Sequence, residues 1–313
     1  MLPEVLPLRH ASRELVRELG FLQNRDASTK LSHSHCHALI EIESRGSLPQ
    51  VELPPHLRLD KSTTSRVVAE LEARAWVRAR TSSDDKRARI LTLTAKGREK
   101  VKLVHREANG RVEDALRLLG DAERAAVLAG MQTYARALER ARRRAGFVIR
   151  PVAAGDRAGC TRLIRAVMPE FGAVGPGYAI NDPEVDDMFG AYQGKRTAYF
   201  VVVPRAADGR RGGAREVHGG GGFGPLRGGD GETCELRKMY FLPALRGLGL
   251  GQEVLDRCFE AARRAGFRRM YLETIPSMTQ ARALYDRNGF VPRARPLGAT
   301  GHYTCNTFML REL

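Results

Sequence analysis

Three glycines alternate with larger residues where strand-like sequence gives way to helical sequence. The run before them, 234–241, is strand-like, and the run after them, 252–259, has a helical pattern. Glycine lets the backbone approach a ligand closely, and the free amides and dipole of a first helical turn attract anions. The turn therefore predicts a pocket for a phosphorylated ligand. Its residues are Arg246, Gly247, Leu248, Gly249, Leu250 and Gly251.

The spacing in this turn differs from two common nucleotide motifs. It does not end in Gly-Lys-Ser/Thr, as the nucleotide P-loop does, and its glycines do not follow the Rossmann pattern G-x-G-x-x-G. A second motif, A-x-x-L-Y-x-x-x-G-F, lies at 281–290, with a strand-like run at 269–273 between the two. The R-x-x-G-x-G turn and the later motif, in this order, resemble the GNAT superfamily of N-acetyltransferases. The alternative is a generic α/β sheet with a glycine turn.

The resemblance covers 147–313 and implies an α/β fold, with a mixed sheet splayed at its centre and helices on both faces. It also implies transfer of an acetyl group from acetyl-CoA to an amine, either a small molecule or a protein lysine. The pyrophosphate is expected on the amides of 246–251, and the pantetheine arm on the backbone of Met239 and Phe241. Tyr285 matches the general acid that protonates the departing thiolate, or it is a packing residue of the last helix.

The amine must lose a proton before it attacks, so a carboxylate is expected near the cleft. Glu235 and Glu273, on the two central strands, are the candidates, although either could instead pair with Arg237 or Lys238. His302 and Cys305 either face the acceptor pocket or pack. At Met278 many members of the superfamily have an Asn that helps bind the cofactor arm.

Composition sets limits on the class of protein. A chain of 313 residues has room for two domains, and a net charge of +16, spread over both halves, is compatible with nucleic-acid binding. Five scattered cysteines predict reduced thiols in the cytoplasm. We expect no membrane span, because no apolar run approaches roughly 18 residues. We expect no signal peptide, because Arg and Glu interrupt residues 1–20. We expect no metal site, because only His33 and His37 of the His-rich run share a helix face.

The first half reads as mostly helical, with helices expected at 4–22 and 32–44. In a further helix, 59–72, Asp60 is a good N-cap, and the apolar side chains form an inward face. A β-hairpin with strands at 76–80 and 88–93 follows. Exposed hydroxyl groups can contact base edges and phosphates of DNA, and cations can neutralise its phosphates or enter its minor groove. The candidates are Lys61, Ser62, Thr63, Thr64, Ser65 and Arg66 on the helix, and Arg80, Lys86, Arg87 and Arg89 on the hairpin.

This helix and hairpin, with the motif L-T-x-x-G ending at Gly97, resemble the MarR family of winged helix-turn-helix transcription regulators. The resemblance implies a homodimer on double-stranded DNA, with residues 4–24, 95–118 and 121–145 at the dimer interface. An apolar stripe that includes Val112 and Leu118 could equally pack within one subunit. Pro54 and Pro55 predict that the helix leading into the turn is short or broken.

The predicted architecture is two domains, a mostly α winged helix-turn-helix at 1–146 and an α/β GNAT fold at 147–313. Strands are expected at 147–152, 197–204 and 217–223, and a helix at 182–192. The favoured function is a bifunctional cytoplasmic protein that binds DNA and acetylates an amine. One alternative is a regulator whose second domain only senses acyl-CoA or a small ligand, and the other is an enzyme whose winged helix only dimerises.

Overall fold

The computed structural model describes residues 1–22, 31–81, 85, 88–205 and 216–313. Contacts within the chain divide it into two compact units, Met1–Leu128 and Ala129–Leu313. The division falls inside the long helix α6 (Asp121–Ala145), so this helix contributes to both units. The predicted domain boundary at residue 146 lies just after the end of the same helix and stays a prediction.

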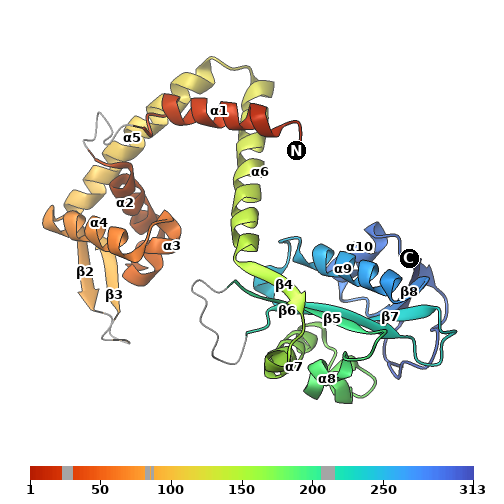
Figure 1. Cartoon of the computed structure of the whole chain (residues 1–313). Helices are drawn as coiled ribbons and strands as arrows, with labels where there is room; N and C mark the ends of the chain where they lie inside the picture. The colour runs from red at the N-terminus through yellow and green to blue at the C-terminus, as the bar shows by residue number, and fades with distance from the viewer. Residues whose placement is uncertain (23–30, 82–84, 86–87, 206–215) are drawn as a thin grey trace. The chain divides into compact units, whose positions relative to one another are not determined.

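The first unit is a helical fold with a small sheet (Figure 1). Before the division its elements are α1 (Val5–Glu18), α2 (His33–Arg45), β1 (Leu48–Pro49), a 3₁₀ turn (Gln50–Glu52), α3 (Leu53–Leu57), α4 (Lys61–Ala73), β2 (Val77–Thr81), β3 (Arg89–Leu93) and α5 (Ala95–Arg117). Asp60 caps α4 by accepting a hydrogen bond of 2.8 Å from the amide of Thr63. The inward face of α4, including Val67 and Leu71, is buried as predicted, in one cluster with residues of α2 and α5.

Helix α3 is five residues long, which confirms the prediction drawn from its two prolines. Both prolines lie in the first turn, where their missing N–H groups cost no helical hydrogen bond. The helix ends at Arg58, which has a left-handed backbone with φ of 58°. Leu53 at its start is fully buried, so even this short helix anchors the approach to α4.

The hairpin is present, and β3 pairs with both β2 and β1 in an antiparallel sheet of order β1-β3-β2. Gly97 explains the end of the L-T-x-x-G motif. Thr94 caps α5 by accepting a hydrogen bond of 3.0 Å from the amide of Gly97. A Cβ at position 97 would lie 1.9 Å from the carbonyl oxygen of Trp76, so only glycine lets α5 approach the chain so closely.

In the described part of the second unit, seven strands form one sheet of order β4-β5-β6-β7-β8-β10-β9. Helices α9 and α10 cover one face, and α7 and α8 the other (Figure 1). The strands are β4 (Phe147–Pro151), β5 (Ala198–Pro204), β6 (Gly219–Pro225), β7 (Thr233–Phe241), β8 (Arg269–Thr274), β9 (Val291–Arg293) and β10 (Thr307–Glu312). The helices are α7 (Arg157–Val167), α8 (Met188–Ala191), α9 (Leu250–Arg264) and α10 (Thr279–Arg287).

The sheet is mixed and splayed, as predicted. Strands β7 and β8 are parallel, and they pair only where Thr233, Cys234 and Glu235 face Arg269, Met270 and Tyr271. Beyond Glu235 the two strands separate. In the separated part of β7, Lys238 has a φ of 52° at a register shift opposite the glycines of β6. This irregularity is a β-bulge, a feature that bends a strand and disrupts its pairing.

The glycines of β6 are required by close packing against β5. A Cβ at Gly222 would lie 2.3 Å from the carbonyl oxygen of Ala198, and one at Gly220 would lie 2.8 Å from that of Phe200. The ring of Tyr199 occupies the same space, and its hydroxyl donates a hydrogen bond of 2.9 Å to the carbonyl of Lys238. The glycine-rich strand therefore makes room for a tyrosine that supports the bulge.

One predicted element is wrong. Residues 182–192 do not form a single helix, but a 3₁₀ segment (Pro183–Asp187) followed by the one-turn helix α8. Asp187 breaks the path because its φ of −141° and ψ of 68° are not helical, and its side chain caps α8 by accepting from the amide of Gly190. The irregular segment places Asp182 at the site described below.

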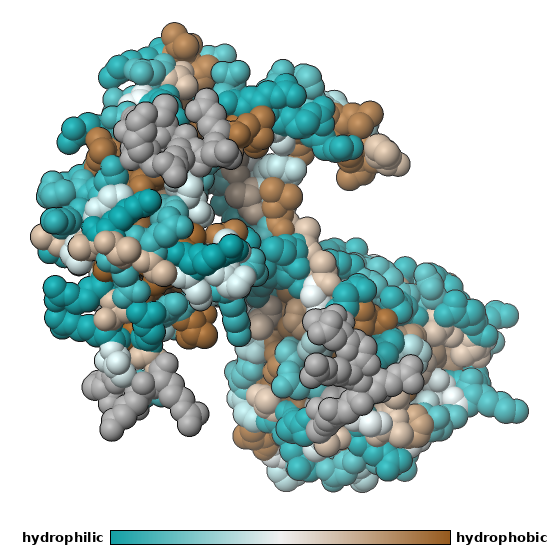
Figure 2. Space-filling model, turned by 60° about the vertical axis from the view of Figure 1, so that its left-hand side comes forward, coloured by the Kyte–Doolittle hydropathy of each residue, from teal (hydrophilic) through white to brown (hydrophobic). Residues whose placement is uncertain are grey.

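The apolar side chains of α1, of α6 and of the C-terminal half of α5 are not buried within the chain. Val112 and Leu118 are 50% and 87% exposed, and neither α1 nor α6 buries any residue. Apolar side chains are visible among polar ones on the surface (Figure 2). Packing within one subunit therefore does not account for the stripe that the sequence shows.

Candidate functional sites

A small pocket of about 50 Å³ lies where β7 and β8 separate. Its polar walls come from both strands and from the chain before β10, and they include Glu235, Lys238, Glu273 and His302. Its other walls are largely apolar: Met168, Ala173, Tyr178, Ala179, Ile275 and Met278. The splay thus exposes two carboxylates to a cavity, although both strands belong to the centre of the sheet.

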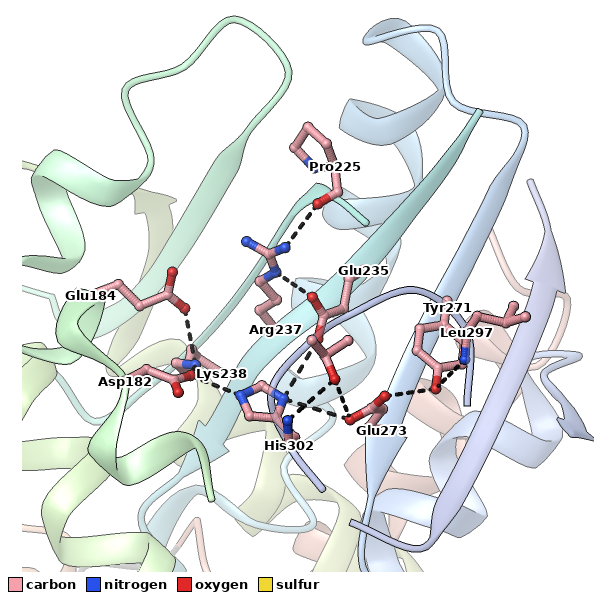
Figure 3. A network of polar contacts seen from close by, with 11 residues as sticks. Asp182, Glu184, Pro225, Glu235, Arg237, Lys238, Tyr271, Glu273, Leu297 and His302 are labelled. Carbon is pink, nitrogen blue, oxygen red and sulfur yellow. Dashed lines mark hydrogen bonds and ion pairs between the residues drawn. The ribbon is translucent and has the colours of Figure 1, made fainter. Parts of the chain in front are cut away.

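His302 lies between the carboxylates of this pocket (Figure 3). Its Nδ1 is 3.8 Å from Glu235 Oε1 and 3.7 Å from Glu273 Oε2. Its Nε2 is 2.9 Å from Asp182 Oδ2, in the irregular segment that replaces the predicted helix. The structure places His302 in the wall of this pocket. Cys305 also lines it.

Glu273 is held by hydroxyl groups. Tyr271 donates to Oε1 at 2.8 Å, and Thr300 donates to Oε2 at 3.0 Å. The side chain is 3% exposed, and burial raises the pKa of Glu273 despite these two hydrogen bonds. Neither Arg237 nor Lys238, the partners that the sequence suggested, pairs with it. A carboxylate with a raised pKa is a better proton acceptor for an ammonium group.

The pKa of His302 is also raised. Burial disfavours the charged imidazolium, but the hydrogen bond and the charge of Asp182 favour it and prevail. Because Glu235 and Glu273 lie on the other side of the ring, a proton on His302 is surrounded by carboxylates. The pair formed by Glu273 and His302 can therefore receive a proton inside the pocket.

Two cations in the pocket wall are already paired. Arg237 Nε donates to Glu235 Oε2 at 2.7 Å, which confirms the structural pairing that was considered for Glu235. Lys238 Nζ forms ion pairs with Asp182 and, at 3.0 Å, with Glu184. The Lys238 side chain is 1% exposed, so its ammonium group is buried against these two carboxylates.

The predicted phosphate turn lies at the start of α9. Gly249 is the N-cap in the left-handed conformation, with a φ of 79°. The amide of Glu253 makes the first hydrogen bond of this helix, to the carbonyl of Gly249. The amides of Leu250, Gly251 and Gln252 precede it and have no partner within the helix. This is the arrangement that binds an anion at a helix N-terminus.

The turn is braced from two sides. Arg246 donates to the carbonyl of Phe241 at 3.0 Å and pairs with Glu170 at 2.8 Å. Arg144, at the end of α6, forms an ion pair with Glu253 and donates to the carbonyl of Leu248 at 3.3 Å. No motif in the sequence signals this contact of Arg144 with the turn.

Tyr285 is buried in the core and packs edge-on against Phe290, with ring centroids 5.6 Å apart. Burial raises the pKa of its hydroxyl, so the group holds its proton, as a general acid requires. It neighbours Tyr240, a wall residue of the pocket, whose pKa is raised by burial and then by Tyr285. Met239 and Phe241, on the separated part of β7, lie beside Gly251.

The candidate DNA-binding surface lies on α4 and the hairpin. Lys61, Ser62, Ser65 and Arg66 are exposed, and Thr63 is half-buried. Thr64 is wrongly placed in this set. It is 1% exposed, and its hydroxyl donates at 2.9 Å to the carbonyl of Asp60. Thr64 lies in the first turn of α4, on the side of the helix that faces the core.

The hairpin residues behave differently from one another. Arg80 is exposed. Arg89 is engaged within the chain, where it pairs with Glu72 at 2.9 Å and donates to Gln50 at 2.9 Å. Lys86 and Arg87 lie outside the described residues. Of the two candidate hairpin cations that the structure describes, Arg80 is therefore better placed than Arg89 to meet a phosphate backbone.

Comparisons with known proteins agree with both parts of this picture. The family model described as Acetyltransferase (GNAT) family matches residues 161–290, and the MarR family model matches residues 31–88. The chain is 41% identical over 167 residues to the uncharacterised N-acetyltransferase YjgM of Escherichia coli (strain K12). The matched region covers 53% of this chain and 95% of YjgM. The chain belongs to the GNAT acetyltransferase family, and a MarR-family winged-helix region precedes the acetyltransferase part.

Solved structures resemble each part separately. The structure of YncA from Salmonella typhimurium with its cofactor acetyl-CoA is 23% identical, with a TM-score of 0.42, and covers 53% of this chain and 94% of that chain. A mutant MarR from Escherichia coli complexed with operator DNA is 18% identical, with a TM-score of 0.35, and covers 42% of this chain and 94% of that chain.

No described helix is both long and apolar enough to cross a membrane. No group of three or more potential metal ligands from His, Cys, Asp and Glu comes together among the residues with a described position.

Proposed function

We propose that this protein is an acetyl-CoA-dependent N-acetyltransferase fused to a dimeric, DNA-binding winged helix. The observation that carries the enzymatic part is the pocket at the splay, where Glu273 and His302 can accept a proton. The glycine turn at the start of α9 fits the phosphates of acetyl-CoA, because its first amides lack helical partners and Gly249 has the left-handed backbone such a turn needs.

The proposed reaction begins when the acceptor ammonium group gives a proton to Glu273 or His302. The neutral nitrogen then attacks the thioester carbonyl carbon, and a C–N bond forms. As the C–S bond breaks, Tyr285 protonates the departing thiolate, and the nitrogen loses its second proton, which returns through solvent to Tyr285. Backbone groups of Met239 and Phe241 hold the pantetheine arm, because β7 has no β8 partner beyond Glu235.

Acetyl transfer to a panel of amines, amino acids and basic proteins, with mass spectrometry of the products, tests the enzymatic proposal. In Glu273→Gln, which keeps the shape and removes the proton acceptor, turnover should fall by about 10²–10⁴-fold. Glu260→Gln is the matched control, because Glu260 lies on the exposed side of α9 and its side chain is 63% exposed. Equal turnover in the two variants would remove Glu273 from the reaction.

The DNA-binding part of the proposal rests on the exposed cations and hydroxyls of α4 and on Arg80. A dimer places two such surfaces about one duplex turn apart, so a pseudo-palindromic site is expected. Footprinting on genomic fragments tests this. Acetyl transfer without any protected site would favour an enzyme whose winged helix only dimerises, whereas a protected site without acetyl transfer would favour a regulator that senses acyl-CoA or a small ligand.

The dimer is supported by the apolar row along α6. Val127, Met131, Tyr134 and Leu138 follow one another at intervals of four, three and four residues, and all are at least 38% exposed. This is the spacing of a helix that packs against another helix. The proposed interface comprises 4–24, 95–118 and 121–145, of which residues 23 and 24 lie outside the described part of the chain.

Substitution within this row tests the dimer. Met131→Glu should shift the protein toward monomer in sedimentation equilibrium, because it places a charge in an apolar contact. The neighbouring Gln132→Glu, on another face of the same exposed helix, should leave the distribution unchanged. A monomeric parent protein, or a Met131→Glu variant that stays fully dimeric, would contradict this interface.

A further inference from the structure

The charges around the pocket do not balance. Two carboxylates line it, Glu235 and Glu273, and two more, Asp182 and Glu184, lie against the buried Lys238. Against these four stand two permanent cations, Arg237 and Lys238. With all four carboxylates ionised, these six groups together carry two negative charges. A proton on His302 reduces the total to one negative charge.

Neither cation is available to an incoming anion. The Lys238 side chain is 1% exposed, and its ammonium group already meets two carboxylates. Arg237 is bound to Glu235 on one side and donates to the carbonyl of Pro225 at 2.8 Å on the other (Figure 3). In the described part of the chain, no Lys or Arg forms an ion pair with Glu273, whose partners are hydroxyls and, at 3.7 Å, His302.

We propose that the acceptor is a small primary amine that carries no carboxylate next to its amino group. This inference rests on the proposed acetyl transfer. An ammonium group entering the pocket meets Glu273 and the ring of His302, and so supplies the missing positive charge. An α-amino acid would bring its carboxylate into surroundings that are already negative and whose cations are both paired.

The rest of the pocket fits the same class of acceptor. Met168, Ala173, Ile275 and Met278 provide apolar walls for this small pocket. Such walls accept an aliphatic or aromatic carbon skeleton but do not solvate a second anion. Overall, R–NH₃⁺ and acetyl-CoA give the acetamide, free CoA–SH and one proton, which leaves through Glu273 or His302 to solvent.

The test uses pairs of acceptors with one aliphatic amino group that differ only in the α-carboxylate: tyramine and tyrosine, phenethylamine and phenylalanine, histamine and histidine. With the full-length protein and acetyl-CoA, kcat/KM should be at least about tenfold higher for the carboxylate-free member of a pair that is used, because an unpaired like charge in the site disfavours binding. Equal or better use of the amino acid overturns the inference while the acetyl transfer stands.

Failure of the underlying function gives a different result. If the protein binds acetyl-CoA in calorimetry but acetylates no small amine and no basic protein, the proposed function itself fails. If only protein lysines are acetylated, the function stands and the inference of a small acceptor is overturned.

A matched pair of variants tests the electrostatic reason directly. Glu184→Gln removes one of the two carboxylates on Lys238, so the preference for the carboxylate-free acceptor should fall at least about threefold. Asp186→Asn is the control, because Asp186 lies in the same 3₁₀ segment but pairs with the exposed Arg165 at 2.7 Å, and it should leave the preference unchanged. An unchanged preference in both variants would overturn the electrostatic argument.

Discussion

Gly249 and Gly266 allow the cofactor turn to be tested against a control at the opposite end of one helix. Gly249 is the N-cap of α9, and Gly266 follows its C-cap, with φ values of 79° and 81°. A Cβ at Gly266 would meet no atom within 4 Å, and one at Gly249 would meet only the end of the Arg144 side chain at 3.0 Å. Changing either residue to Glu therefore introduces similar backbone strain and the same charge.

The expected cost in stability is alike for both variants. A left-handed backbone costs a residue with a Cβ roughly 1–2 kcal/mol. In a unit of this size that lowers the thermal midpoint by about 2–8 °C. Both Gly249→Glu and Gly266→Glu should therefore remain folded at 25 °C, with similar losses in a thermal unfolding scan.

Binding should separate the two variants. In Gly249→Glu the carboxylate lies where the pyrophosphate is expected, and two like charges about 4 Å apart repel by about 4 kcal/mol at an effective dielectric constant near 20. That corresponds to a loss of roughly 10²–10³-fold in affinity for acetyl-CoA. Isothermal titration calorimetry measures it directly. If Gly249→Glu and Gly266→Glu bind acetyl-CoA equally well, the turn does not hold the phosphates.

Three further predictions concern the acid, the proton acceptors and the hairpin. Tyr285→Phe keeps the ring packing but removes the proton, so turnover should fall by about 10²–10⁴-fold with unchanged acetyl-CoA affinity in calorimetry; a variant with near-normal turnover would return Tyr285 to a packing role. Because the pKa values of Glu273 and His302 are raised in the folded protein, kcat/KM should increase as the pH rises through these values. The two groups also contribute to stability. This contribution is fully present below pH 4.5 for Glu273 and below pH 6.5 for His302, and it is lost as the pH rises through the raised values. A His302→Gln variant whose pH profile and unfolding midpoints match the parent would contradict the part assigned to His302. Arg80→Ala should reduce the salt dependence of DNA binding by about one unit of slope, and Arg89→Ala, whose guanidinium is already paired with Glu72, should reduce it less; equal slopes for the parent and Arg80→Ala would remove Arg80 from the interface.

Features that depend on local sequence were predictable. The turn at 246–251 combines a glycine in the left-handed conformation with a helix start, and both properties belong to neighbouring residues. The end of the hairpin is similar, because Thr94 caps the helix that Gly97 allows to approach Trp76. The two prolines of α3 shortened that helix as expected, since an imide nitrogen has no hydrogen to donate.

Features that depend on distant contacts were not predictable from the pattern. Thr64 has the same chemistry as its neighbours on α4, yet it faces the core. The irregular path at Asp187 prevented the predicted helix and placed Asp182 beside His302, 120 residues later in the chain. Arg144 reaches Glu253 across 109 residues, and no local signal distinguishes it from the other arginines at the end of α6.

The sequence by itself determined the two families, the order of their elements and the glycine turn, because periodicity, caps and glycines act over a few residues. Only the tertiary structure decided which charged groups meet. It paired Arg237 with Glu235, buried Lys238 against two carboxylates, and left Glu273 with hydroxyls and His302. The physical reason is that burial and pairing depend on where β7 and β8 separate, and that separation, which lies beside a bulge in β7, is not marked by any short motif.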